Sequence, residues 1–154
     1  MQGVVGYTPG VFDLFHVGHL DVLRRAGELC DHLVVGVFAD ELAERLRGTR
    51  PVVPLIERME IVGNVRHVGR VVPLEEAALR DAWEELGFDV VFTGPPSPGV
   101  PDPETVEREL AGTGVRAVRF NGLAETRSPV LRERLRLPHP GDHAGAAAPR
   151  SSVA

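Results

Sequence analysis

The chain contains no lysine, so all 17 of its basic residues are arginines. A compositional bias is sufficient to explain this, but it has a chemical consequence. Any phosphate contact that a lysine makes in other proteins has to be made here by an arginine. Arginine stays charged and can bind two oxygens at once, so the exchange keeps the charge and changes the geometry of the contact.

Cysteine is nearly absent as well. The single Cys30 cannot form a disulfide within the chain, so nothing indicates an oxidising compartment. Residues 1–7 lack the basic and apolar regions of a secretion signal. No stretch approaches the roughly 18 apolar residues of a membrane span. The expectation is a cytoplasmic protein with no membrane partner.

An excess of positive charge is also missing. The net charge is -5 and aromatic residues make up 5% of the chain, which argues against nucleic acid as a partner. The length of 154 residues and the hydrophobic content of 43% suit one globular domain, which we assign to residues 1–137. Residues 138–154 are rich in Pro, Gly, Ala, Ser and His without periodicity, and are expected to form a disordered tail.

Apolar runs and helical periodicities alternate along the chain. The patterns predict strands at 4–8, 33–38, 68–72, 88–92 and 115–120, and helices at 17–29, 40–46, 54–65, 74–86, 103–111 and 128–135. Pro9 and Gly10 are interpreted as a turn that closes the first strand. The order predicts an α/β fold of the Rossmann-like type, a parallel five-stranded sheet with helices on both faces.

The most informative segment is 10–20, which reads Gly-Val-Phe-Asp-Leu-Phe-His-Val-Gly-His-Leu between the first strand and the first helix. Phosphates bind at this place in α/β sheets, on free N–H groups of the helix start. Gly10 allows a close approach of the backbone. His16 and His19 share one side of the helix, which Gly18 keeps open, and their rings can stabilise charge on a leaving pyrophosphate. The alternative is that both are structural histidines.

Segments 10–13 and 16–19 resemble the signature of the cytidylyltransferase family, whose members act on glycerol phosphate, choline phosphate and ethanolamine phosphate. The first 70 residues are similar to that family throughout, and the rest in outline. The resemblance implies the HxGH nucleotidyltransferase fold, a homodimer, and Mg²⁺ bound mainly through the nucleotide phosphates, with no metal ligand from the protein. It further implies nucleotide-binding roles for Gly10, Val11, Phe12, Asp13 and Gly18.

Three arginines extend the resemblance. Arg47, in the basic loop 47–51, stands where the family usually has a lysine that reaches the phosphates. Arg58, in a Glu-x-Arg helix, and Arg66, before the third strand, match arginines that would contact anions. His16, His19, Arg47 and Arg58 are therefore the predicted catalytic residues, and Arg66 is a predicted nucleotide contact. The alternative for the arginines is a solvated charge or a partner for a nearby glutamate.

The sequence departs from the family in three places. The family's Gly-Asp-Asp-Trp after the fourth strand is Gly-Pro-Pro-Ser at 94–97, which leaves Gly94 as a predicted nucleotide contact. Gly69 replaces a usual aspartate. The closing Arg-Thr-x-Gly-x-Ser-Thr-Thr element becomes 121–128, with Asn121 in place of its arginine, for which Arg119 or Arg127 is a candidate substitute. The remaining predicted nucleotide contacts in this element are Thr126, Arg127 and Ser128.

These features predict an enzyme that transfers CMP from CTP to a phosphorylated or phosphonate small molecule and releases pyrophosphate. The lost carboxylates favour an acceptor more anionic than glycerol phosphate, such as a phosphonate or a carboxylated phosphate, because fewer carboxylates repel it. Two alternatives stay open. One is an adenylyltransferase that uses ATP, and the other is a catalytically degenerate nucleotide-binding protein, which the altered loop and the missing arginine suggest.

Overall fold

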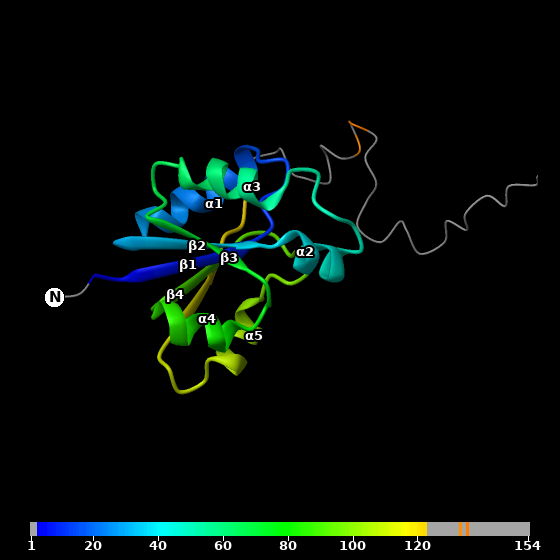
Figure 1. Cartoon of the computed structure of the whole chain (residues 1–154). Coiled ribbons are helices and arrows are strands. Elements are labelled where there is room, and N and C mark those ends of the chain that lie inside the picture. The colour runs from blue at the N-terminus through cyan, green and yellow to red at the C-terminus, as the bar shows by residue number, and fades with distance from the viewer. Residues whose placement is uncertain (1–2, 123–132, 134, 136–154) are drawn as a thin grey trace, which may run out of the picture.

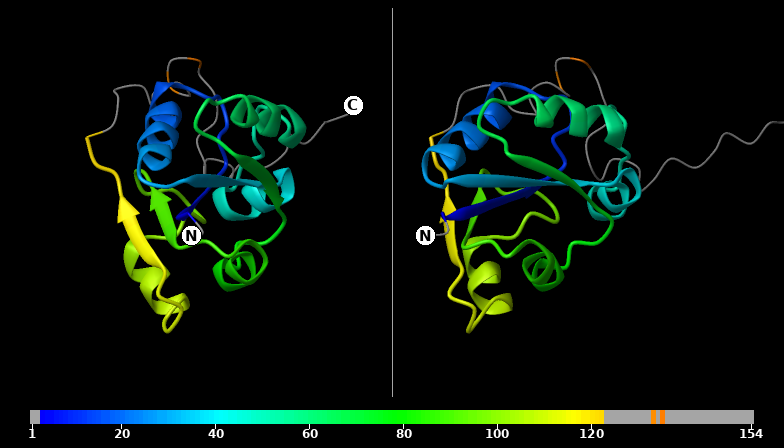
Figure 2. Two further views of the ribbon diagram at one scale, coloured as in Figure 1. Left: turned by 90° about the vertical axis from the view of Figure 1, so that its left-hand side faces the viewer. Right: turned by 60° about the vertical axis from the view of Figure 1, so that its left-hand side comes forward.

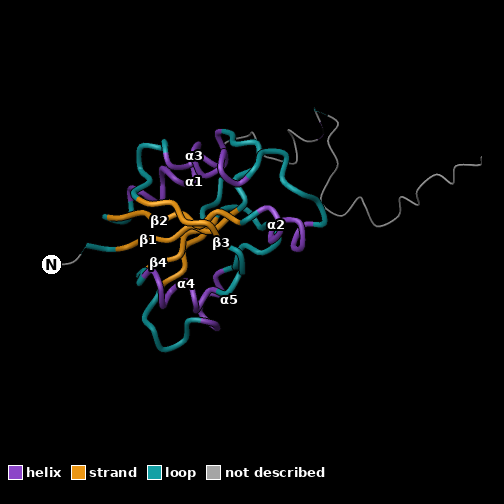
Figure 3. The backbone as a smooth tube through the Cα atoms, in the orientation of Figure 1, coloured by secondary structure: helices purple, strands orange, loops and turns teal. Residues whose placement is uncertain are grey.

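The computed structural model describes residues 3–122 together with residues 133 and 135. Over these residues the chain forms three layers, with one five-stranded parallel sheet in the middle (Figures 1 and 3). The strand order is β3-β2-β1-β4-β5. The strands are β1 (Val5–Gly10), β2 (His32–Phe38), β3 (Arg70–Leu74), β4 (Val90–Thr93) and β5 (Arg116–Arg119). The predicted fold class is confirmed.

Helices cover both faces of the sheet (Figures 1 and 2). One face carries α1 (Val17–Glu28) and α3 (Leu55–Gly63), and the other carries α4 (Leu79–Leu86) and α5 (Pro103–Glu109). A further helix, α2 (Asp40–Arg47), directly follows β2 at the carboxyl end of that strand. In the described part of the chain, no helix combines the length and the apolar character that crossing a membrane requires.

The sheet separates two apolar cores. Val35 and Val37 of β2 are fully buried on the α1 face, whereas Tyr7 of β1 and Val91 of β4 are buried on the α4–α5 face. Strands with apolar side chains on both faces read as continuous apolar runs, because each face packs against helices. This explains the run at 33–38.

Several predicted boundaries were wrong. β1 continues through Pro9 and Gly10, which pair with β2. A proline is tolerated at position 9 because β4 pairs with β1 only at Gly6 and Tyr7, so the N–H group that Pro9 lacks would have no partner in β4. β3 runs to Leu74, which pairs with Phe38, and α4 therefore begins at Leu79 rather than at residue 74. The predicted helix at 128–135, apart from residues 133 and 135, and the predicted tail at 138–154 lie outside the described residues.

Candidate active site

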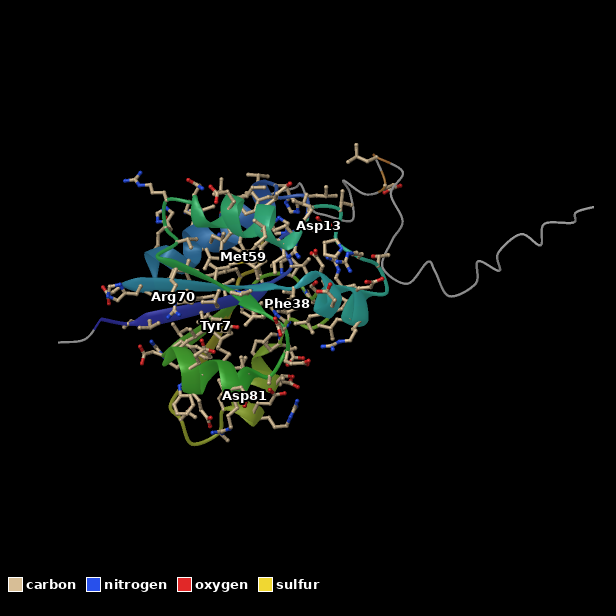
Figure 4. All side chains as sticks on the ribbon, in the orientation of Figure 1. Tyr7, Asp13, Phe38, Met59, Arg70 and Asp81 are labelled. Carbon is tan, nitrogen blue, oxygen red and sulfur yellow. The ribbon has the colours of Figure 1, made fainter. Side chains whose placement is uncertain are left out.

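The histidine motif lies at the carboxyl edge of the sheet, in the turn between β1 and α1. The turn is strained, because Phe12 and Leu14 have φ angles of 56° and 51°, which non-glycine residues adopt at a cost. Asp13 between them is 1% exposed. Its two carboxylate oxygens accept hydrogen bonds from the N–H groups of Val52 and Val53, both at 2.9 Å. These bonds hold the motif turn against the segment that follows the basic loop, and Asp13 is labelled in Figure 4.

The two histidines are held by the start of α1. His16 is the N-cap residue, and its Nδ1 accepts a hydrogen bond from the Gly18 N–H at 3.0 Å. The Nδ1 of His19 accepts one from the His16 N–H at 3.3 Å. Because both Nδ1 atoms are acceptors, each neutral ring carries its proton on Nε2. The rings stack with centroids 3.9 Å apart, so the two imidazoles lie side by side at the start of α1.

The surroundings of His19 keep it uncharged. Burial of the ring, followed by the neighbouring His16 and the charge of Arg47, lowers the pKa of His19 to about 3. Burial alone lowers the pKa of His16. Both rings are therefore neutral donors near pH 7. Arg47, the last residue of α2, is thus close enough to the motif for its charge to act on His19.

Arg58 does not face the site, and the prediction that it contacts phosphate was wrong. Its side chain is 0% exposed. The guanidinium donates to the carbonyls of Val53, Val11 and Phe38 at 2.7–2.8 Å and to the Asp40 carboxylate at 2.6 Å. These bonds leave no face for a ligand. Arg58 instead joins the motif turn, β2 and the segment after the basic loop, so it is a positioning residue.

Arg66 was also misplaced by the prediction. It is an exposed residue just before His67, and His67 packs against Gly27 in the last turn of α1. Ten residues separate Gly27 from Val17 at the start of α1, which corresponds to about 15 Å along the helix. The structure therefore places Arg66 near the end of α1 that is remote from the histidines. The sequence pattern of an arginine next to a helix does not indicate at which end of the sheet the arginine lies.

The remaining predicted nucleotide contacts are distributed unevenly. Val11 and Phe12 are buried, and the Phe12 ring lies 5.5 Å from that of His19. Gly10 is required for packing, because a Cβ there would lie 3.0 Å from the Phe12 ring. Gly18 is buried in α1, and Gly94 directly follows β4 and is half-buried. The last three predicted contacts lie outside the described residues: Thr126, Arg127 and Ser128.

Sequence reasoning missed a cavity of about 290 Å³ at the same edge of the sheet. It lies on the α4–α5 face, below the carboxyl ends of β1, β2 and β3. No motif marks it, because its lining comes from strand ends and loops that are far apart in the sequence. Its lining residues are Tyr7, Pro9, Phe38, Leu74, Glu76, Ala77, Ala78, Leu79, Gly99, Val100, Pro101, Asp102, Thr105 and Glu109.

Comparison with known proteins shows the family of the chain. Residues 7–126 match the family model described as cytidylyltransferase-like. The bifunctional protein HldE of Acidiphilium cryptum is 41% identical over 91 residues, which are 58% of this chain and 19% of that protein. The FAD synthase of Thermococcus sibiricus is 38% identical over 89 residues, which are 57% of this chain and 60% of that protein. The matched region is thus about a fifth of HldE and less than two thirds of the FAD synthase.

Two solved structures share the fold. The lipopolysaccharide core biosynthesis protein of Thermoplasma volcanium has a TM-score of 0.70 and 25% identity, over 78% of this chain and 98% of that one. A protein of unknown function from Archaeoglobus fulgidus has a TM-score of 0.59 and 20% identity, over 80% and 95% of the two chains. At that identity the second likeness concerns the fold alone.

Proposed function

The chain belongs to the cytidylyltransferase-like family, and on this premise we propose that it transfers a nucleoside monophosphate from a nucleoside triphosphate to a phosphorylated small molecule, with release of pyrophosphate. The observation that carries the proposal is the pair of stacked, neutral histidines at the start of α1, whose Nδ1 atoms accept backbone N–H groups and which therefore carry their protons on Nε2. Arg47 adds a positive charge beside them.

The proposed reaction is an in-line displacement. An oxygen of the acceptor phosphate forms a bond to the α-phosphorus, while the bond from that phosphorus to the bridging oxygen breaks and pyrophosphate leaves with the electron pair. Such a transfer depends mainly on positioning and on stabilisation of charge, so it needs no covalent nucleophile from the protein. His16 and His19 donate their Nε2–H groups to phosphate oxygens, and Arg47 neutralises charge that develops on the leaving group.

We propose that Mg²⁺ is held mainly by the phosphates of the nucleotide, where it supplies further charge neutralisation. The donor groups near the motif fit this arrangement. The carboxylate of Asp13 is occupied by two N–H groups and that of Asp40 by Arg58. Among the described residues, no group of three or more His, Cys, Asp or Glu side chains gathers as a metal site. We propose that the protein itself contributes the Nε2–H groups of the two histidines and the charge of Arg47.

The identity of the nucleotide is the finer part of the proposal. The motif turn resembles that of cytidylyltransferases and favours CTP. The relative named FAD synthase favours ATP, because its named product contains an adenylyl group. We therefore propose CTP as the first candidate and ATP as the second. Thermal shift assays with each nucleotide and Mg²⁺ would separate them, since a ligand that binds only the folded state raises its stability.

The test of the proposal is pyrophosphate release by the purified chain with CTP or ATP, Mg²⁺ and a panel of phosphorylated acceptors. Replacing His16 or His19 by Ala is expected to lower kcat by about 10²–10³-fold each, the range for removal of one preorganised donor, while the variants stay folded. Unchanged turnover in both variants would exclude the mechanism. Nucleotide binding without pyrophosphate release across the panel would instead support a degenerate nucleotide-binding protein.

A further inference from the structure

We infer that the turn at 97–100 positions Arg47 for the reaction by holding the last turn of α2 in place; the inference rests on the proposed nucleotidyl transfer. This turn belongs to the segment after β4, in which the sequence departs from the cytidylyltransferase family. The carboxylates that the family carries there are absent at 94–97. In this chain the altered segment packs against α2.

The backbone of this turn is well defined. The N–H of Val100 donates to the carbonyl of Ser97 at 3.0 Å. Pro98 occupies the second position of the turn, and Gly99 occupies the third with a φ of 79°. These are the features of a type II β-turn, which favours proline at the second position and glycine at the third. Because proline fixes its own φ, the turn has few alternative conformations and can support a neighbouring element.

Leu46, in the last turn of α2, packs directly on Gly99. A Cβ on Gly99 would collide with Cδ1 of Leu46 and would lie 3.0 Å from Cε2 of Phe38. The side chain of Leu46 therefore occupies space that only a glycine leaves open. Leu46 and Val100 both pack against an apolar cluster that includes Val11 of the motif turn. One cluster thus joins the motif turn, α2 and the turn at 97–100.

The two ends of α2 are held differently. The helix has eight residues, and a helix this short is unstable without tertiary packing. In Figure 1, α2 lies at the end of the sheet and not over either face. Its first residue, Asp40, is bonded to the buried Arg58. Near its last turn, Arg45 pairs with Glu76, but both side chains are exposed, and such pairs contribute little. The packing of Leu46 is therefore an important anchor of this end.

Arg47 directly follows Leu46 and is the last residue of α2. Consecutive side chains of a helix point about 100° apart, because there are 3.6 residues per turn. The packing of Leu46 on the turn therefore fixes the direction in which Arg47 leaves the helix. Arg47 is half-buried, and its charge acts on His19. A loosened last turn would move this charge away from the proposed position of the leaving group.

The experiment disrupts the contact of Leu46 with the turn in two ways, in the full chain. Leu46→Ala removes the side chain, and Gly99→Ala expels it from its position. Each variant is expected to lower kcat for pyrophosphate release by about tenfold, because small misplacements of a catalytic group slow the reaction strongly. The KM for nucleotide is expected to change little. The double variant should be no slower than Leu46→Ala, since both substitutions disrupt one contact.

Each variant has a matched control on the remote side of the sheet. Leu86 is the last residue of α4 and packs on the α4–α5 core, so Leu86→Ala removes the same side chain from another helix end. Gly112 has a φ of 82°, and a Cβ there would meet nothing within 4 Å. Gly112→Ala therefore introduces the same backbone strain without a collision. Both controls are expected to lower stability and to keep kcat within about twofold.

A second readout does not depend on turnover. The NMR signals of the His19 ring protons at pH 7, assigned by their loss in His19→Gln, report on the charge of Arg47. Arg47→Gln defines the change that loss of this charge produces. Leu46→Ala and Gly99→Ala are expected to shift the signals in the same direction, and the two controls are expected to leave them in place.

The outcomes distinguish the positioning role from the chemistry. Unmoved His19 signals in Leu46→Ala and Gly99→Ala, an unchanged kcat, or equal kinetic effects in the controls overturn the inference and leave nucleotidyl transfer in place. Fully additive effects in the double variant also overturn it. If Gly99→Ala does not fold, the comparison of Leu46→Ala with Leu86→Ala decides. Shifted His19 signals without pyrophosphate release from any pair of nucleotide and acceptor support the positioning of Arg47 and contradict the proposed transfer.

Discussion

At the scale of single residues, the neutral state of His19 links the stability of the fold to pH. Its pKa is about 3 in the folded chain and about 6.5 in an unfolded one. The unfolded state therefore takes up the proton first as the pH falls below 6.5. The contribution of the neutral ring to stability is complete above that value and is lost progressively toward pH 3. His16 shifts in the same direction and adds to the effect.

The prediction is that the free energy of unfolding decreases by about 1.4 kcal/mol between pH 7.5 and pH 5.5 through His19 alone. Urea denaturation at several pH values measures it. His19→Gln should flatten this part of the profile, whereas His32→Gln, which changes an exposed histidine at the start of β2, should leave it unchanged. An equally steep profile in His19→Gln would show that His19 is not the group responsible.

Arg58 provides a second prediction at the same scale. A buried structural arginine should affect mainly stability, whereas a phosphate contact should affect mainly nucleotide binding. Its guanidinium makes four hydrogen bonds in the core, one of them to Asp40. Replacing it by Met removes the buried cation and leaves the Asp40 carboxylate with Arg50 alone, 3.6 Å away, so the expected loss of stability is about 3 kcal/mol, the lower end of the range for breaking a buried pair. Arg58→Lys, which keeps the charge, is expected to lose much of the same stability, since one ammonium cannot reproduce the planar set of donors.

Kinetic measurements on Arg58→Lys, made below the melting temperature of this variant, distinguish a positioning role of Arg58 from a role in phosphate binding. A positioning residue is expected to change Tm strongly and the KM for nucleotide weakly. A large rise in KM with an unchanged Tm would restore the original assignment of Arg58 as a phosphate contact.

At the scale of elements, the site depends on how the basic loop is attached to the motif turn. Asp13 accepts hydrogen bonds from the backbone N–H groups of Val52 and Val53, in the segment that follows Arg47 at the end of α2. Asp13→Asn replaces one acceptor oxygen by an NH₂ group that faces an N–H donor. We expect a loss of about 1–3 kcal/mol in stability and a fall of at least tenfold in kcat/KM, because Arg47 is then held less firmly beside His19.

Asp31→Asn is the control for Asp13. The Asp31 carboxylate also accepts a backbone N–H, from Val4 at 2.7 Å, but at the opposite edge of the sheet. Its loss should lower stability without lowering kcat/KM. Urea denaturation and pyrophosphate release on both variants provide the comparison. Equal kinetic effects at the two sites would show that Asp13 acts through general stability alone.

These contacts between distant segments explain why the sequence predicted the helices and strands better than it predicted the candidate site. Strand and helix types follow from local patterns, and the position of the histidines follows from the junction of β1 and α1. The arginines depend instead on contacts across the fold. Arg47, Arg58 and Arg66 are all polar residues near helix ends in the sequence. Only the packed structure shows that the first approaches His19, the second is enclosed and the third lies at the far end of α1.

The cavity was beyond prediction for a related reason. Its walls come from β1, from the ends of β2 and β3, from the segment that leads into α4, and from α5 with the loop before it. No periodicity relates these segments to one another. Gly99 is the one wall residue with a local signature. Its φ is +79°, and a Cβ there would collide with Leu46 of α2, so glycine is required where the altered loop packs against that helix.

At the scale of the whole molecule, apolar side chains remain exposed on the helices of the histidine face. Val17 and Leu20 of α1 are 48% and 42% exposed, and Ile56 and Ile61 of α3 are 76% and 42% exposed. Both helices cover the same face of the sheet (Figure 2). Exposed apolar patches commonly mark contact surfaces, and two-fold dimers are the most frequent assemblies of soluble proteins. The homodimer implied by the family resemblance is therefore predicted to form through α1 and α3.

Sedimentation velocity at micromolar concentration tests this prediction, with a dimer as the expected species for the unaltered chain. Ile56→Asp is expected to give a monomer, because a carboxylate buried in an apolar interface loses its hydration without gaining a partner. Ala111→Asp places the same charge at an exposed position after α5, on the other face, and should leave the dimer intact. A monomeric unaltered chain would refute the prediction. A dimer that survives Ile56→Asp but not Ala111→Asp would move the interface to the α4–α5 face, where it would lie next to the cavity.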